Sequence, residues 1–414
     1  MLSVQEAENI VLQHKITLDT APSEFLREGV LLMKSLGRIL AEDLTADRDF
    51  PPFDRVTMDG IAIRFQDFKN GQRTFAVRGI QAAGAPPLTA QHPTGMGICL
   101  EVMTGAMLPE ETDTVIRYED LHIEHGLAEI LIETIDFQQN LHFKGIDRKL
   151  GDALILRGRK ISSAEIATAA TIGKTHLQVL KLPKIAIVST GDELVNIAHT
   201  PLPYQIRRSN VYAIAAMLET EFKIKSQLFH FNDNKELIFK GLKKVLSKFD
   251  IVILSGAVSE GKFDFVPKVL DELGVEKLFH KVAQRPGKPF WFGKFKDKSV
   301  IFALPGNPVS TFLCAYRYVV PFLKQSYELS TLHYPLSIEY AVLSEKVVFK
   351  PNLTYFLPVK LTYTEGGIME AKPLAGHGSG DLANLNDADG FLELPQIGDV
   401  FEKGEAFPLI RYRP

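Results

Sequence analysis

Cysteine and net charge are both scarce in this sequence. Among 414 residues there are 2 Cys, and 47 Lys and Arg nearly balance 50 Asp and Glu, which leaves a formal net charge of −3. So few cysteines exclude a disulfide scaffold. The balanced charge excludes a general field that would attract nucleic acid or an anionic membrane, so we expect neither as a partner. Any anionic ligand must be held by a local arrangement of groups.

Long apolar runs are absent as well. The nearest approach to a membrane span, residues 299–316, is interrupted by Pro305-Gly306-Asn307-Pro308, which predicts a strand, a tight loop and a helix. The N-terminal segment carries acidic residues and no apolar core of a signal peptide, so we expect a cytoplasmic protein. Cys99 and Cys314 lie in apolar surroundings without a C-x-x-C partner, which predicts that they pack in the core.

In the first part of the chain, the pattern of apolar residues changes from helical to strand-like and back to helical. Apolar residues at helical spacing predict one helix near residues 4–11 and a second over residues 23–44. Short runs rich in Val, Ile and Gly predict a β-rich domain over residues 46–142. The segment 151–174 returns to a helical pattern, with Ser162 or Ser163 as its N-cap.

The second part of the chain repeats one arrangement three times. The apolar runs KIAIV, DIVIL and VIFAL each end in a loop of small residues that leads towards a helix. This spacing predicts a parallel, doubly wound α/β sheet over residues 181–325, with ligand-binding loops at the carboxyl ends of the strands. The remaining residues, 326–414, predict a small all-β unit.

The loop Leu304–Ser310 is a candidate anion seat. It follows a buried strand, and Pro308 near the first helical turn leaves N–H groups unpaired where the helix dipole favours an anion. An ordinary strand-to-helix turn explains the same residues equally well. Arg285 and Lys288, in RPGKPFWFGKF, could converge on an anion or belong to a solvated turn. No G-x-x-x-x-G-K-[ST] or G-x-G-x-x-G is present, which disfavours P-loop and standard dinucleotide sites.

Acidic residues follow two of the three strands. Asp192 and Glu193 of STGDELV suit a hydrated Mg²⁺ or hydrogen bonds to a ribose, or they cap a following helix. The loop SGAVSEGKFDF repeats the arrangement with Ser259, Gly261 and Asp264. Two such loops at one sheet edge favour a functional role over two unrelated turns.

Further acids occupy polar turns in the N-terminal half. They are Asp54 and Asp59 in PPFDRVTMDGIAIR and Asp147 in KGIDRKLGD, while TGAMLPEETD presents Thr104 and Gly105. Each turn is unremarkable alone. Together they make chemical sense if they hold a metal ion against phosphate or oxyanion groups.

Six segments in this order resemble one known family. PPFDxxxMDGxA, TGAxLPExxD, STGDELV, SGxVSxG..D, PGKPxxFG and LPGNPVS are similar to the molybdopterin molybdenumtransferases, the MoeA family, which includes the E-domain of gephyrin-type proteins. The resemblance covers essentially the whole chain. It implies molybdenum cofactor biosynthesis: insertion of molybdate into adenylylated molybdopterin with Mg²⁺-dependent release of AMP. It also implies a homodimer and allows contact with a MogA-type adenylyltransferase.

The resemblance and the texture together predict a multidomain α/β plus β fold. We expect a helix-rich linker and dimer domain of residues 1–45 and 143–180, of which residues 1–20 could pack on the α/β domain. Residues 46–142 form the β-rich inserted domain in this interpretation. Residues 181–325 form a MogA-like, three-layer α/β domain with a parallel-rich sheet, and residues 326–414 form a C-terminal β-barrel.

The resemblance assigns site roles motif by motif. It implies catalytic roles for Asp59, Asp147, Asp264 and Lys288, with the three aspartates as metal ligands. The implied substrate-binding residues all lie in the quoted loops or in the C-terminal HGSGDL, and are Thr104, Gly105, Thr190, Gly191, Asp192, Glu193, Ser255, Gly256, Ser259, Gly261, Arg285, Pro286, Gly287, Pro305, Gly306, Asn307, Pro308, Ser310 and Ser379.

Several positions depart from the family pattern. Ala257 stands where a second Gly is common, and Arg285 replaces a common Lys before PGKP. Pro358 stands where many relatives carry an Arg directed at the molybdate pocket, and Lys360 is the candidate substitute.

Two other functions compete with this interpretation. The α/β segment alone is similar to the MogA-type molybdopterin adenylyltransferases, but these would lack the parts before residue 181 and after residue 325. A gephyrin-like binding or scaffold protein would usually carry a fused second domain and a linker, and neither is visible here.

Overall fold

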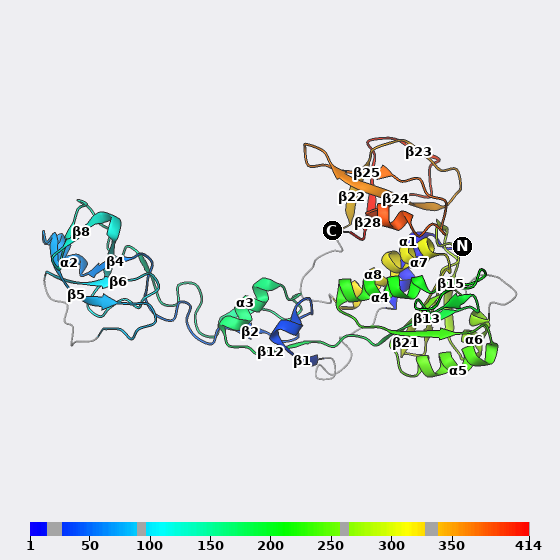
Figure 1. Cartoon of the computed structure of the whole chain (residues 1–414), viewed down its shortest axis with the longest axis horizontal. Coiled ribbons are helices and arrows are strands. Elements are labelled where there is room, and N and C mark those ends of the chain that lie inside the picture. Colours follow the sequence, from blue (N-terminus) through cyan, green and yellow to red (C-terminus); the bar gives the residue numbers. More distant parts are fainter. Residues whose placement is uncertain (15–26, 89–96, 257–264, 328–337, 414) are drawn as a thin grey trace. The chain divides into compact units, whose positions relative to one another are not determined.

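The computed structural model describes residues 1–14, 27–88, 97–256, 265–327 and 338–413 (Figure 1). These residues form two compact units. The first consists of residues 1–41, 158–162 and 176–414, and the second of residues 42–157 and 163–175. No helix among the described residues combines the length and the apolar character that crossing a membrane would require.

A six-stranded sheet is the centre of the first unit. Its strand order is β16 (Gln227–Phe231), β13 (Ile185–Thr190), β17 (Ile251–Ser255), β21 (Ser299–Leu304), β20 (Trp291–Phe295) and β18 (Glu276–His280). The first four strands run parallel, while β20 and β18 are antiparallel to their neighbours. Every residue of β13, β17 and β21 is buried, as expected for parallel strands covered on both faces.

Helices cover both faces of this sheet. Alternate residues of β13 divide between two cores: Ile185 and Ile187 face one side, and Ala186 and Val188 the other. The first core receives α1 (Val4–Gln13), α4 (Ser209–Phe222), α7 (Pro308–Cys314), the π turn η4 (Ala315–Val319) and α8 (Val320–Tyr327). The second receives α5 (Lys235–Leu246) and α6 (Val266–Glu272). The predicted three-layer, parallel-rich fold is confirmed (Figure 1).

The C-terminal residues close into a five-stranded barrel, as predicted. The strands follow one another in the order β24 (Thr354–Tyr363), β25 (Met369–Pro373), β22 (Glu339–Leu343), β28 (Ala406–Arg411) and β26 (Gly390–Leu394), and β26 pairs back with β24. Two short segments, β23 (Val347–Val348) and β27 (Val400–Phe401), pair beside it, and α9 (Asn384–Asp387) precedes β26. The strand β19 (Gln284–Arg285) pairs with β24, so it joins the barrel to the α/β part.

The helix predicted over residues 23–44 is wrong where the structure describes it. Residues Arg27–Leu31 form β1, which pairs with β12 (His176–Leu180), and a short 3₁₀ turn, η2 (Leu32–Ser35), follows. Gly29 lies inside the strand, and Gly37 has a φ of +80°, which a helix cannot accommodate. A strand partner far away in the sequence therefore outweighs the local helical spacing.

The second unit contains a six-stranded sheet, as its Val-rich runs predict. The order is β7 (Thr114–Arg117), β4 (Gly60–Ile63), β6 (Ile98–Val102), β5 (Thr74–Gln81), β9 (Leu127–Ile130) and β8 (Leu121–Glu124). The same unit holds the short helices α2 (Phe65–Lys69) and α3 (Ser163–Thr171). Two short pairs, β2 (Leu44–Thr45) with β11 (Ala153–Ile155) and β3 (Arg55–Val56) with β10 (Leu141–His142), carry the polar turns of this half.

Both cysteines are unpaired and wholly buried, in agreement with the sequence prediction. Cys99 lies in the core of the second unit, where burial raises the pKa of its thiol to about 12. Cys314 lies in the core of the first unit, and burial raises the pKa of its thiol still further. Both thiols are therefore protonated at neutral pH.

A buried arginine joins three distant segments of the first unit. The Arg317 guanidinium on η4 lies 2.7 Å from Glu8 of α1 and 3.0 Å from Glu393 of β26. Only 10% of the Arg317 side chain is exposed. The two carboxylates thus compensate a charge that water does not solvate.

We predict that Arg317→Met lowers the free energy of unfolding of the first unit by about 3 kcal/mol, because it leaves two poorly solvated carboxylates without their partner. Urea unfolding measured by the fluorescence of Trp291 tests this, since this single Trp is buried in β20 of the same unit. The control is Lys346→Met, which removes an ion pair at 2.7 Å whose side chains are 55% and 56% exposed. That change should cost less than about 1 kcal/mol. Equal effects of the two substitutions would contradict the assigned role.

Candidate functional site

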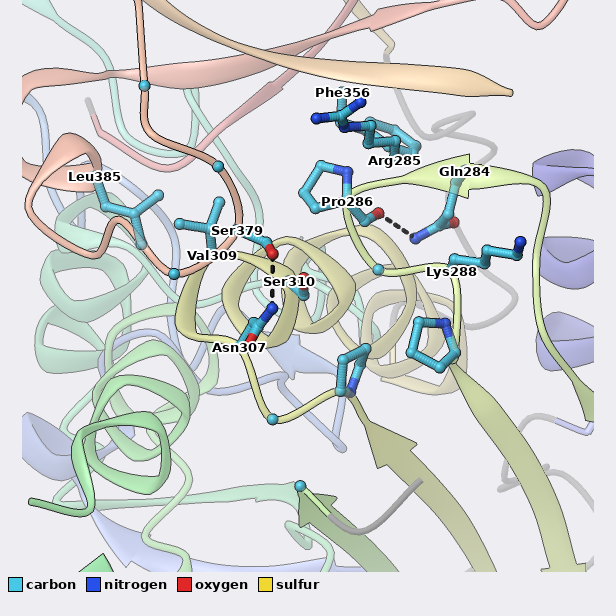
Figure 2. A pocket seen from close by; sticks show the side chains of 18 of the residues that line it. Gln284, Arg285, Pro286, Lys288, Asn307, Val309, Ser310, Phe356, Ser379 and Leu385 are labelled. Atoms are coloured by element: carbon cyan, nitrogen blue, oxygen red, sulfur yellow. Dashed lines mark hydrogen bonds between the residues drawn. The ribbon is translucent and has the colours of Figure 1, made fainter. Parts of the chain in front are cut away.

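A cleft of about 990 Å³ lies in the first unit, between the carboxyl edge of the parallel sheet and the barrel (Figure 2). The loops after β13 and β21, with Gly256 at the end of β17, form its floor, and β24 with residues 374–380 forms the opposite wall. Ligands of open α/β sheets bind at this edge, where the strands end. The volume suits a small organic ligand.

The loop Pro305–Ser310 lines the cleft between β21 and α7. The Asn307 side chain donates from Nδ2 to Ser379 Oγ at 2.7 Å, and the Val309 N–H donates to the Ser379 carbonyl at 3.0 Å (Figure 2). Pro308 has no N–H, so fewer free backbone donors remain than the sequence analysis predicts for an anion seat. Through these two hydrogen bonds, the loop instead holds the barrel segment that carries Ser379 against the α/β part.

Asn210, which no sequence motif singles out, forms hydrogen bonds that hold the same loop. Its Nδ2 lies 2.8 Å from the Gly306 carbonyl, 3.0 Å from Ser255 Oγ and 3.2 Å from Thr311 Oγ1. These contacts fix the end of β17 and the loop after β21 at one spacing. A single Asn at the start of a helix gives no distinctive signal in the sequence.

The cationic side of the cleft is the turn that carries Arg285 and Lys288 between β19 and β20. Both side chains are exposed in the cleft wall, and neither forms an ion pair within the described part of the chain. The Arg285 guanidinium carbon lies 6.0 Å from the centre of the Phe349 ring. Two cations from one short turn therefore remain available to an anionic ligand.

The acidic side of the cleft lies after β13 and β16. The residues that line it are Thr190, Gly191, Glu193 and Asp233. No sequence motif points to Asp233. Burial, together with the nearby carboxylates of Asp192 and Glu193, raises the pKa of the Asp233 carboxyl above its usual value. A side chain at Gly191 would collide with the Glu193 carboxylate, because a Cβ there would lie 2.5 Å from Oε2.

Asp192 is not among the residues that line the cleft. Its Oδ1 accepts hydrogen bonds from Asn232 Nδ2 at 2.8 Å and from the Asp233 N–H at 3.3 Å, and so ties together the loops after β13 and β16. The alternative that Asp192 and Glu193 cap a helix is wrong, because the chain continues into the strand β14 (Leu194–Val195).

Four of the predicted site residues lie in the second unit: Asp59, Thr104, Gly105 and Asp147. The Asp59 carboxylate accepts the Thr104 N–H at 2.6 Å, and this hydrogen bond lowers the pKa of the exposed carboxyl. Asp147 Oδ1 lies 3.0 Å from His142 Nε2, and His142 Nδ1 lies 2.9 Å from Arg55 Nη2. Because a guanidinium only donates, Nδ1 is the acceptor and Nε2 carries the proton that faces Asp147.

The predicted metal set is not complete among the described residues. Ala257, Ser259, Gly261 and Asp264 lie outside them. Within the described ranges, no group of three or more His, Cys, Asp or Glu side chains is arranged to hold a metal ion.

The barrel wall corrects one expectation about the oxyanion pocket. Pro358 lines the cleft, but Lys360, its candidate substitute, does not. The Lys360 ammonium is paired with Asp389 at 2.9 Å on the barrel surface. His377 is an additional basic residue of the cleft wall, and its Nδ1 lies 3.3 Å from Asp381 Oδ2.

Comparison with known families covers nearly the whole chain. Residues 2–173 match the MoeA N-terminal region (domain I and II), residues 186–325 match a probable molybdopterin binding domain, and residues 340–412 match the MoeA C-terminal region (domain IV). The first region includes residues of both units, the second covers the α/β part of the first unit, and the third covers the barrel.

Individual relatives agree with the family matches. The molybdopterin molybdenumtransferase of Synechocystis is 41% identical over 380 residues, which are 90% of this chain and 92% of the relative. That of Bacillus subtilis is 32% identical over 393 residues, which cover 93% of this chain and 90% of the relative. A crystal structure of the molybdopterin biosynthesis MoeA protein from Pyrococcus horikoshii has a TM-score of 0.80 at 30% identity, with 100% of both chains covered. The chain belongs to the molybdopterin molybdenumtransferase (MoeA) family.

Proposed function

We propose that the cleft binds adenylylated molybdopterin together with molybdate, and that AMP is released as molybdenum is inserted. The protein is an enzyme of molybdenum cofactor biosynthesis, a transferase that acts by molybdenum insertion. The adenylyltransferase alternative is not favoured, because the family matches include the N-terminal and C-terminal regions beyond the α/β part. The scaffold alternative is not favoured either, because the full-length relatives are named as molybdenumtransferases.

The charge distribution along the cleft is the observation that supports this proposal most directly. Along the order of strands in the sheet, Glu193 and Asp233 lie at one side of the cleft, after β13 and β16. Arg285 and Lys288 lie at the other side, next to β20. Carboxyl groups at a strand end suit the hydroxyl groups of a ribose. Cations suit phosphate and molybdate, which is a doubly negative oxyanion. A ligand with a nucleoside at one end and an oxyanion at the other fits this polarity.

Ser379 supplies a further donor on the cationic side. Its Oγ already accepts the Asn307 Nδ2–H at 2.7 Å, so the hydroxyl hydrogen is free to donate to an oxyanion in the cleft. With Arg285 and Lys288, this hydroxyl offsets the repulsion between negative oxygens when the phosphate bond is cleaved. The chemistry proposed here requires no covalent nucleophile from the protein.

We also propose that the release of AMP requires Mg²⁺, with Asp59, Asp147 and Asp264 as ligands. The Asp59 carboxyl supports this, because it is exposed and its hydrogen bond with the Thr104 N–H lowers its pKa further below neutral pH. A bound divalent ion would offset phosphate charge. The homodimer, the contact with a MogA-type adenylyltransferase and the cytoplasmic location are further proposals that rest on the family resemblance.

For the cationic turn, we predict that Lys288→Met lowers kcat/KM for molybdate-dependent AMP release about 100-fold, because a charge that stabilises the oxyanion is lost. The assay is AMP release from adenylylated molybdopterin, with and without molybdate. The matched control is Lys294→Met on β20, whose ammonium is 3.3 Å from Glu276 and does not line the cleft. The assignment fails if both substitutions change the rate by the same factor.

For the metal, we predict that Asp59→Asn raises the Mg²⁺ concentration needed for half-maximal AMP release about tenfold, since a neutral amide replaces a charged ligand. The measurement is a Mg²⁺ titration of AMP release, with EDTA as the zero point. Asp120→Asn serves as the control, because Asp120 is paired with Arg117 at 2.7 Å in the same unit. Activity that persists in EDTA would contradict the requirement for Mg²⁺.

A further inference from the structure

Gln284 is a wholly buried amide directly beneath the cationic turn. It precedes Arg285 in β19, and its side chain forms part of the cleft lining. Burying an amide costs free energy unless its oxygen and nitrogen are both hydrogen-bonded. The partners of this amide therefore indicate what it holds in place.

Both ends of the Gln284 amide have a partner. Its Nε2 donates to the Pro286 carbonyl at 3.1 Å, inside the turn that carries Arg285 and Lys288 (Figure 2). Its Oε1 accepts a hydrogen bond from the hydroxyl of Tyr318 on η4. One amide thus connects the cationic turn to the helical layer below it.

The turn lies closely packed on this amide. Gly287 has a φ of +94°, and a Cβ at this position would lie 2.6 Å from Gln284 Nε2 and 2.6 Å from Cys314 Sγ. Phe290, where the turn ends, stacks on the Tyr318 ring with 4.6 Å between ring centres. The turn therefore packs on the helical layer with no room for a side chain at Gly287, and the hydrogen bond from Gln284 Nε2 to the Pro286 carbonyl holds it there.

Tyr318 is itself firmly held. Its side chain is 1% exposed, and burial raises the pKa of its hydroxyl well above the usual value, so the hydroxyl stays protonated and can donate. The preceding residue, Arg317, is fixed by Glu8 and Glu393. The donor of the hydrogen bond to Gln284, the Tyr318 hydroxyl, is therefore held in a fixed position.

We propose that Gln284 and Tyr318 are positioning residues for molybdate. By holding the Pro286 carbonyl, they set the spacing between Arg285 and Lys288, the two cations that receive the oxyanion. This inference rests on the proposed function of the cleft. Since neither side chain contacts the reacting bond, their loss should weaken molybdate binding more than it slows catalysis.

The first test is Tyr318→Phe, which keeps the ring packing and removes the donor to Gln284. The substitution leaves the buried Gln284 Oε1 without a hydrogen-bond donor. We therefore expect a roughly tenfold rise in KM for molybdate, with kcat and the KM for adenylylated molybdopterin within about twofold of wild type. Tyr316→Phe is the matched control: Tyr316 lies on the same turn, is partly buried and does not line the cleft.

A second variant tests whether the two residues act as a unit. The double substitution Gln284→Met with Tyr318→Phe removes both polar groups from the core, so it should raise the molybdate KM no more than the larger single effect. Full additivity would show that the two side chains act independently and would overturn the inference. Unfolding followed by Trp291 fluorescence verifies that each variant is folded.

Calorimetric titration of molybdate into the protein provides a readout without turnover. We expect Tyr318→Phe to weaken this binding about tenfold and Tyr316→Phe to leave it unchanged. If wild-type protein shows no molybdate-dependent AMP release, the proposed function fails. If wild type is active but Tyr318→Phe alters only the unfolding midpoint, the pair has a purely structural role and the positioning inference is wrong.

Discussion

The first unit depends on the ion pairs of Arg317. This guanidinium is nearly excluded from water, and its two carboxylate partners come from α1, at the start of the chain, and from β26, in the barrel. A buried charge without its partner is costly, so the three segments are stable together and unstable apart. Since β26 pairs with β24, and β24 with β19, the same contact fixes both the barrel wall and the cationic turn of the cleft.

The cleft is held by polar contacts between loops that are remote in sequence. Asn210 connects the end of β17 to the loop after β21, Asn307 binds Ser379 of the barrel segment, and Asp192 connects the loops after β13 and β16. Groups arranged in this way keep their positions before a ligand arrives, so less ordering has to accompany binding. The cleft is thus pre-organised by these side chains, of which Asn307 also lines it.

The sequence predicts the framework well because local patterns encode it: three buried runs followed by small residues define the parallel sheet, and the cations of the PGKP turn stand out from their neighbours. The strand Arg27–Leu31 could not be recognised, because its partner, β12, is far away in the chain. The same reason explains why Asn210, Gln284 and Tyr318 were missed: each is one polar residue in an ordinary element, and its importance comes from distant partners. Lys360 is the reverse case: its charge suggests a place in the cleft, but its ammonium is paired with Asp389 outside it.

The burial of both cysteines has a consequence for the metal that the family handles. Thiolates are strong ligands for soft and transition metals, and only the ionised form binds. Cys99 and Cys314 are inaccessible, and their thiols stay protonated. The sulfur atoms of a molybdopterin dithiolene would therefore meet no competing thiolate from either cysteine of this chain.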